Sequence, residues 1–257
     1  MRYDDPPDHV HPDVIAALNR LAEAGVAWIA NSGRTLEGQL EIIGHSIDER
    51  GLSQWPDAVL HSECYVHMRE DGHYVPLSDW NDQAERWLQQ VQQSLRGDYK
   101  LELEALIDHH RPNGVYHRGD ATVFHVQGEE SGRLAFITAL ESFLAPIPDA
   151  HIVHNGEWIA IVHRRLGKGN IVRAYLAARG LAGDAVLTVG DHGNDLSMLD
   201  GSVTPYVACP GDAYAPVQSA VRAAGGYVAS APGPHGTLEA LRHYFPAFVD
   251  TPLTFTT

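Results

Sequence analysis

Two carboxylates and an amide are crowded together directly after a short apolar segment. The sequence reads Gly-Asp-His-Gly-Asn-Asp at 190–195, and the preceding residues 185–189 are apolar apart from Thr188. Hard divalent cations such as Mg²⁺ prefer carboxylate oxygens and keep several of their waters. An alternative is that Asp191 and Asn194 are only turn and helix-cap residues. Two Asp and one Asn so close to the end of an apolar strand favour a cation site.

Two further polar segments have residue types that bind anions. Residues 31–34 read Asn-Ser-Gly-Arg between an apolar run and a helical pattern, so that the Ser32 hydroxyl and the N–H groups of a glycine-containing turn could hold an anion. The alternative is that Ser32 is an ordinary N-cap. Lys168 stands between Gly167 and Gly169 at the start of another helical pattern. Taken alone, it is better explained as a solvated loop lysine.

Histidine is abundant, with sixteen residues in the chain. His9 and His11 are two residues apart, and His109 and His110 are adjacent. Neither pair has a third ligand at the spacing typical of zinc sites. The sequence therefore predicts no histidine metal site.

Composition restricts the class of partner. The 257 residues have a formal net charge of -15, which argues against nucleic acid, because nucleic acids are held mainly by Lys and Arg. No apolar run reaches the roughly 18 residues of a membrane helix, and no secretory signal is predicted. Two cysteines, Cys64 and Cys209, form no disulfide framework, so we expect a cytoplasmic protein. A small anionic metabolite remains a suitable partner, since a local site can be positive on an acidic protein.

Strand and helix patterns alternate at both ends of the chain. A helix is predicted over 13–24, a fully buried strand over 26–30, and a second strand–helix series from 170 onward. The middle of the chain has strands and helices in mixed order. We therefore expect an α/β fold with a doubly wound, Rossmann-like parallel sheet formed by 1–80 and 165–257, and an inserted α+β cap at 81–164. Ligands bind at the carboxyl ends of such strands, where the three polar segments would meet.

Together, the three segments resemble the motifs of the haloacid dehalogenase superfamily of phosphatases. The pattern at 190–195 is similar to the fourth motif, Ser-Gly-Arg at 32–34 to the second, and Lys-Gly at 168–169 to the third. The insert at 81–164 resembles the α/β cap, type C2B, of the subgroup that includes sucrose-phosphate and mannosyl-phosphoglycerate phosphatases. Residues 225–241 are similar to the C-terminal end of those enzymes.

The resemblance implies an activity, a Mg²⁺ cofactor and a role for each residue. The activity is hydrolysis of a phosphorylated sugar or a similar small metabolite. Asp191 is implied as a direct metal ligand, and Asp195 as a second ligand, direct or through water, or as a residue that orients the metal's waters. Lys168 is implied to neutralise developing charge. The residues implied to contact phosphate or substrate are Ser32, Gly33, Arg34, Lys168 and Asn194.

The first motif of the superfamily, Asp-x-Asp-Gly-Thr, is missing. Its first Asp is the nucleophile, so no nucleophile is assigned in this chain. Asp4 and Asp5 follow no strand and precede two prolines, and are predicted to be loop residues. We expect a start codon assigned too late or a truncated chain; the alternative is a pseudoenzyme that binds a phosphometabolite without hydrolysing it. Because the first strand is central in the superfamily, its two neighbours should face a gap.

One further departure concerns the second strand. Glu63 stands where relatives usually have Asn. This difference bears on which substrate is recognised.

Overall fold

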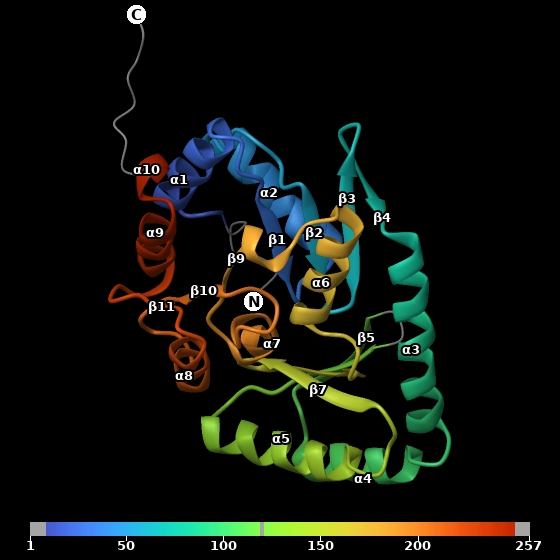
Figure 1. Cartoon of the computed structure of the whole chain (residues 1–257). Helices are drawn as coiled ribbons and strands as arrows, with labels where there is room; N and C mark the ends of the chain where they lie inside the picture. The colour runs from blue at the N-terminus through green and yellow to red at the C-terminus, as the bar shows by residue number, and fades with distance from the viewer. Residues whose placement is uncertain (1–8, 119–120, 250–257) are drawn as a thin grey trace, which may run out of the picture.

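The computed structural model describes residues 9–118 and 121–249, so Asp4 and Asp5 lie outside the described residues. Figure 1 shows three sheets with helices packed around them. Within the described ranges, no helix is long and apolar enough to cross a membrane.

The first sheet contains the early strands in the order β1-β2-β3-β4. β1 (Ile29–Ser32) and β2 (Ala58–His61) are parallel, with Ser32 opposite His61. β3 (Tyr65–Glu70) and β4 (His73–Pro76) continue the sheet as an antiparallel hairpin.

The second sheet is wholly parallel, in the order β11-β10-β9. Its strands are β9 (Leu187–Val189), β10 (Tyr206–Cys209) and β11 (Tyr227–Val228). Short 3-10 turns at Gly183–Ala185 and Gly193–Asp195 precede and follow β9.

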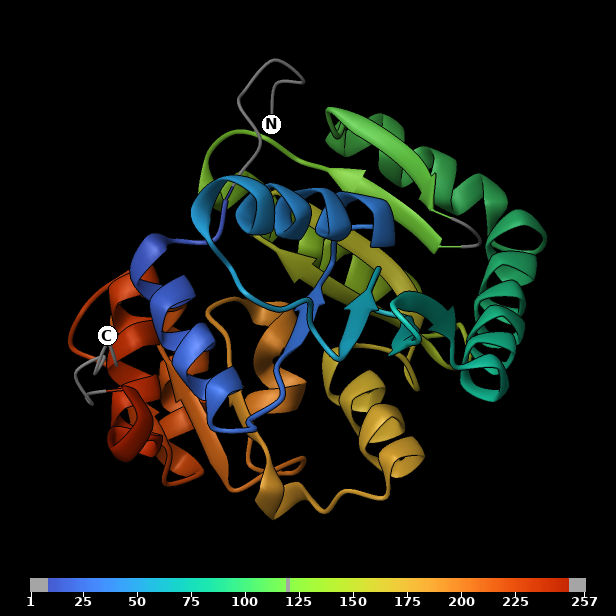
Figure 2. The same ribbon diagram turned by 90° about the horizontal axis from the view of Figure 1, so that it is seen from above.

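Helices cover both faces of these parallel strands, as in a doubly wound fold. One face packs against α6 (Lys168–Arg179), α7 (Leu196–Leu199) and α8 (Ala215–Ala223), in a cluster that includes Leu60, Ile171 and Val207. The other face packs against α1 (Pro12–Glu23), α2 (Leu36–Arg50) and α9 (Gly233–Tyr244), and the short α10 (Pro246–Val249) follows α9. Figures 1 and 2 both place α1 beside α9.

The third sheet is antiparallel, in the order β5-β6-β8-β7. Its strands are β5 (Gly114–Arg118), β6 (Ala121–His125), β7 (Ala150–Asn155) and β8 (Trp158–His163). Its helices are α3 (Ser78–Arg96), α4 (Lys100–His110) and α5 (Glu130–Leu144). A core of its own, with Phe124, Phe136, Leu140 and Ile161 fully or almost fully buried, holds this α+β layer together. The domain limits at 80/81 and 164/165 stay a prediction.

The sheet of β1–β4 and the sheet of β9–β11 do not pair with each other among the described residues. In the described part of the chain, β1 pairs only with β2, and β9 only with β10, although Figure 1 shows β9 and β1 as neighbours in the row of strands. All four residues of β1 are half-buried, whereas all four of β2 are buried. The prediction of a fully buried strand at 26–30 is therefore wrong in position and in burial. The physical reason is the missing neighbour, which leaves one edge of β1 uncovered.

Candidate active site

Lys168 and Asp195 form an ion pair at the centre of the site. Lys168 is the first residue of α6 and its Nζ lies 2.5 Å from Oδ1 of Asp195. The two residues are only 6% and 2% exposed. Burial alone would lower the pKa of Lys168, but the carboxylates of Asp195 and Glu63 raise it above its usual value. The reading of Lys168 as a solvated loop residue is thus wrong, and the site contains a buried positive charge.

The second oxygen of Asp195 is also occupied. Oδ2 accepts hydrogen bonds from the backbone N–H groups of Asp191 and His192, at 2.8 and 2.9 Å. Both oxygens of this carboxylate therefore have strong donors in the described structure. Asp195 fixes the loop after β9 and orients Lys168, and its assignment as a metal ligand stays a prediction.

Asp191 is placed differently. Its side chain is 51% exposed, and Oδ1 lies 2.8 Å from Nδ1 of His192. That hydrogen bond holds the pKa of Asp191 below its usual value, and Asp191 in turn raises the pKa of His192. Asp191 is thus an ionised oxygen donor at the carboxyl end of β9, open to a ligand.

Ser32 is the last residue of β1 and lies at the carboxyl edge of its sheet. Ser32 Oγ accepts from the Arg34 N–H at 3.3 Å. The N-cap of α2 is Thr35, whose Oγ1 accepts from the Gly38 N–H at 3.2 Å. The alternative in which Ser32 is the helix N-cap is therefore wrong, and its hydroxyl lies in the turn that precedes the cap.

Glu63 joins the second and fourth motif segments. Its Oε1 accepts from Asn194 Nδ2 at 2.7 Å. A Cβ at Gly33 would lie 2.8 Å from the same oxygen and 3.9 Å from Asn194 Nδ2, so only glycine fits there without a shift. Burial raises the pKa of Glu63, while the nearby Lys168 ammonium partly lowers it. From the sequence, Glu63 stands out only as a departure from relatives. Its position just after β2, at the carboxyl edge of the sheet, is the sequence signal that could have assigned it to the site.

Three buried side-chain oxygens in this region have no hydrogen-bond partner among the described residues. They are Glu63 Oε2, Asn194 Oδ1 and Asn31 Oδ1. A buried acceptor without a donor costs free energy, so such atoms mark a place where a ligand or water would bind. The donors of the site are Lys168, the second N–H of Asn194 and the Ser32 hydroxyl.

The antiparallel layer reaches the fourth motif through His154 of β7. A Cβ at Gly193 would lie 2.8 Å from Cε1 of the His154 ring, and the Tyr214 ring centre is 6.4 Å from that of His154. Burial lowers the pKa of His154, which favours the neutral imidazole. No sequence pattern singled out His154, since its contact with 190–195 is made only in three dimensions.

Comparison with known proteins adds independent evidence. The family model described as Sucrose-6F-phosphate phosphohydrolase matches residues 124–245. That range contains Lys168 and the whole of 190–195. No curated protein sequence matches the chain.

Solved structures with the same fold cover nearly the whole chain. A sucrose-phosphatase from Synechocystis sp. PCC6803, in complex with sucrose and phosphate, is 16% identical, with a TM-score of 0.65 over 90% of this chain and 91% of its own. A putative HAD/COF-like hydrolase from Plasmodium vivax is 14% identical, with a TM-score of 0.66 over 91% and 88%. The HAD subclass IIB sugar phosphatase BT4131 is 16% identical, with a TM-score of 0.58 over 91% of both chains.

The resemblance to haloacid dehalogenase sugar phosphatases is confirmed. The expected fold class, a Rossmann-like α/β core with a second α+β layer, is also confirmed. Within this fold, the structure brings the three segments that resemble the second, third and fourth motifs to one edge. Arg34, at the end of the second motif, is exposed there.

Proposed function

We propose that this chain is a Mg²⁺-dependent phosphatase for a phosphorylated sugar or a similar small metabolite. One observation carries the proposal: three segments far apart in sequence converge through the Lys168–Asp195 ion pair and the Gly33–Glu63–Asn194 contact. Phosphoryl transfer depends mainly on positioning and on stabilisation of negative charge. The buried ammonium and the nearby hydroxyl and amide donors are suited to both tasks.

Each residue has a defined task in this proposal. The Ser32 hydroxyl and the free N–H of Asn194 hydrogen-bond the phosphoryl oxygens. The Lys168 ammonium neutralises charge on the transferring group, and Asp195 holds that ammonium in place. Arg34, exposed at the mouth of the site, contacts the rest of the substrate. His154 covers the fourth-motif loop from the cap side.

The donor set fits a magnesium ion with a single protein carboxylate. Mg²⁺ is commonly held by one or two carboxylates together with waters and substrate phosphate oxygens. Asp191 provides an ionised and half-exposed carboxylate, whereas both oxygens of Asp195 are occupied. Bound Mg²⁺ would withdraw charge from the phosphoryl oxygens. We assign Asp191 as the direct ligand and Asp195 as the residue that positions the loop.

The nucleophile is proposed to come from a strand between β1 and β9. The chain has no Asp-x-Asp-Gly-Thr segment, and the two facing edges lack backbone partners among the described residues. A parallel strand there would complete the sheet, and its carboxyl end would lie beside Ser32 and Asp191. We also propose the division into a core of 1–80 and 165–257 and a cap of 81–164. The expected setting is cytoplasmic, and Cys64 and Cys209 are both free thiols.

A second function, from a different class, is favoured by the missing first motif. On this reading the chain binds a phosphorylated metabolite at Ser32 and Lys168 without hydrolysing it. Both functions use the same donors, so binding does not separate them; turnover does.

The test compares two purified proteins. The first is the 257-residue chain, and the second has a hydrophobic strand ending in Asp-x-Asp-Gly-Thr fused ahead of Met1. We expect Mg²⁺-dependent phosphate release from p-nitrophenyl phosphate and from sugar phosphates only with the fused strand. The matched control carries Asn in place of both Asp residues of the added strand. Binding of sugar phosphate without turnover in both proteins would support the binding function instead.

A further inference from the structure

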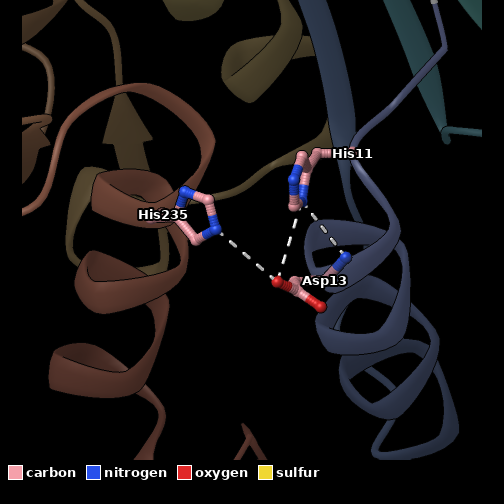
Figure 3. Close-up of side chains that lie close together, drawn as sticks. All are labelled: His11, Asp13 and His235. Carbon is pink, nitrogen blue, oxygen red and sulfur yellow. Dashed lines mark hydrogen bonds and ion pairs between the residues drawn. The ribbon is translucent and has the colours of Figure 1, made fainter.

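A separate cluster of metal-ligating side chains lies where the first helix meets the ninth. His11 is the N-cap of α1, Asp13 is in the first turn of the same helix, and His235 is in the first turn of α9. One ligand atom from each lies within 4.8 Å of the other two. Figure 3 shows the imidazole rings of His11 and His235 both directed at the Asp13 carboxylate.

The individual distances are slightly longer than those between the ligand atoms of a zinc site. Asp13 Oδ2 lies 3.9 Å from His11 Nδ1 and 3.8 Å from His235 Nε2. The two imidazole rings are 4.9 Å apart, edge to face. In a tetrahedral zinc site with bonds of about 2.0–2.1 Å, ligand atoms are about 3.3 Å apart. Small rotations of these three side chains would bring the ligand atoms to that spacing. Asp13 and His235 are exposed and so are free to make them.

The two helices that carry the ligands are held rigidly together. Ala17 and Leu21 of α1 pack against Leu238 and Leu241 of α9 in one buried cluster. The start of α9 is fixed further by the Gly233 N–H, which donates to Asp212 Oδ1 at 2.7 Å. The backbones of the three ligands are therefore placed before any ion binds, which reduces the entropy lost on binding.

We propose that His11, Asp13 and His235 bind a zinc ion that links α1 to α9. Two imidazoles and one carboxylate, with a fourth position open to water, form a ligand set that suits Zn²⁺ better than Mg²⁺ or Ca²⁺, which take oxygen ligands. The partial positive charge at two helix N-termini lowers the affinity for a cation. The Asp13 carboxylate and the net charge of -15 act in the opposite direction.

This site shares no residue with the candidate active site, and spacing along the chain did not predict it. The prediction of no histidine metal site rested on the lack of a third ligand near His11 in sequence. His235 supplies that ligand from the other end of the chain, through the packing of α1 against α9. The proposed role is structural, because a metal that binds only the folded chain stabilises it.

The test measures zinc binding by the whole chain, with no reference to phosphatase activity. A chromophoric chelator competing for Zn²⁺ gives the dissociation constant and stoichiometry, and Co²⁺ in place of Zn²⁺ gives the visible absorption of a tetrahedral site. We expect one zinc ion at micromolar affinity. At a free Zn²⁺ concentration about 100 times the dissociation constant, the melting temperature should rise by about 5–10 °C.

Variants locate the ion. His235→Ala should weaken binding by about 100-fold or more and abolish the cobalt spectrum, and Asp13→Asn should weaken binding by at least about 10-fold. Both keep His11, whose Nδ1 accepts from the Asp13 N–H at 3.3 Å in the ion-free chain. Zinc bound at this nitrogen would replace that capping hydrogen bond. The matched control is His243→Ala, an exposed histidine on α9 outside the cluster, which should bind as the parent does.

Three outcomes would overturn the site. One is unchanged zinc affinity in His235→Ala, and another is no binding in the micromolar range by the parent chain. The third is a loss confined to His192→Ala, which would place the ion beside Asp191 instead. Circular dichroism of each variant confirms that it is folded before the comparison is made.

Discussion

Replacing Glu63 with Gln tests whether the site contains a strained buried carboxyl group. Glu63 is 5% exposed, and its Oε2 has no hydrogen-bond partner among the described residues. Gln has the same shape, and its amide oxygen still accepts from Asn194 Nδ2, as Oε1 does now at 2.7 Å. The substitution therefore removes a charge with little change in packing.

The sign of the effect follows from the pKa. Burial raises the folded-state pKa of Glu63 above the unfolded value of 4.5. The folded chain thus holds this proton more tightly than the unfolded chain does, and stability falls as pH rises from 4.5 to the folded pKa. Gln removes that loss, so its benefit is present at neutral pH and absent below pH 4.5.

The magnitude is set by two opposing contributions. An unpartnered buried atom remains in Gln as the amide nitrogen, so the gain comes from removing the charge. Desolvating an ionised carboxylate costs more than desolvating a neutral amide, and attraction between ionised Glu63 and Lys168 offsets part of that cost. We expect Glu63→Gln to gain about 1–2 kcal/mol at pH 7.5, or about 2–8 °C in melting temperature for a chain of this size.

The assay is urea unfolding at pH 7.5 and at pH 4, with Glu85→Gln as the matched control. Glu85 is an exposed carboxylate on α3, so its replacement should change stability by less than about 0.5 kcal/mol at both pH values. A loss of stability in Glu63→Gln at pH 7.5, or an equal change at both pH values, would refute the reasoning. The first outcome would show that Lys168 stabilises ionised Glu63 by more than burial costs it, and the second would show that the effect does not come from the charge.

Three other substitutions test the site and the fold. Lys168→Met leaves Asp195 buried without its cation and should lower the free energy of unfolding in urea by about 3–5 kcal/mol. The control is Lys100→Met, at the other lysine of the chain, which is exposed and should cost less than about 1 kcal/mol. Equal losses would contradict the buried pair. Hydrogen bonds from the segment after β11 and from β11 itself lower the pKa of Glu239 to about 2. Glu239→Gln should therefore lower the urea midpoint at pH 7, and the difference in midpoint between parent and variant should shrink as pH falls from 4.5 toward 2. A difference independent of pH would count against the charged form. In the strand-completed chain, Asp191→Asn should lower turnover by about 100-fold; near-normal turnover and Mg²⁺ dependence would show that Asp191 is not the ligand.

Much of the fold and site was predictable because its signals are local. The alternation of apolar runs with helical patterns predicted the Rossmann-like class, which is confirmed. The grouping of polar residues after 185–189 marked 190–195 as a strand end. The sequence also predicted that this segment would meet Lys168 at one edge, and the Lys168–Asp195 contact agrees with that. The strand before Lys168 is antiparallel, however, so the rule for parallel strands does not explain this meeting.

Other features depend on contacts between distant parts of the chain. The sequence contains a Ser, a Gly and a Thr near residue 33, but only the backbone path decides that Thr35 caps α2 and leaves Ser32 in the turn. The strand pattern at 26–30 predicted full burial, whereas burial depends on both neighbours of a strand, and β1 has one among the described residues.

The residue types and their spacing determined which chemistry this protein could perform: a cation-binding loop, an anion-binding turn and a lysine. The tertiary structure decided which atoms remain available for that chemistry. It occupies both oxygens of Asp195, leaves Asp191 open, and inserts Glu63 between Gly33 and Asn194. The physical reason is that hydrogen-bond partners and burial depend on three-dimensional contacts. Folding brings together groups that lie far apart in the sequence, and no local sequence pattern marks such pairs.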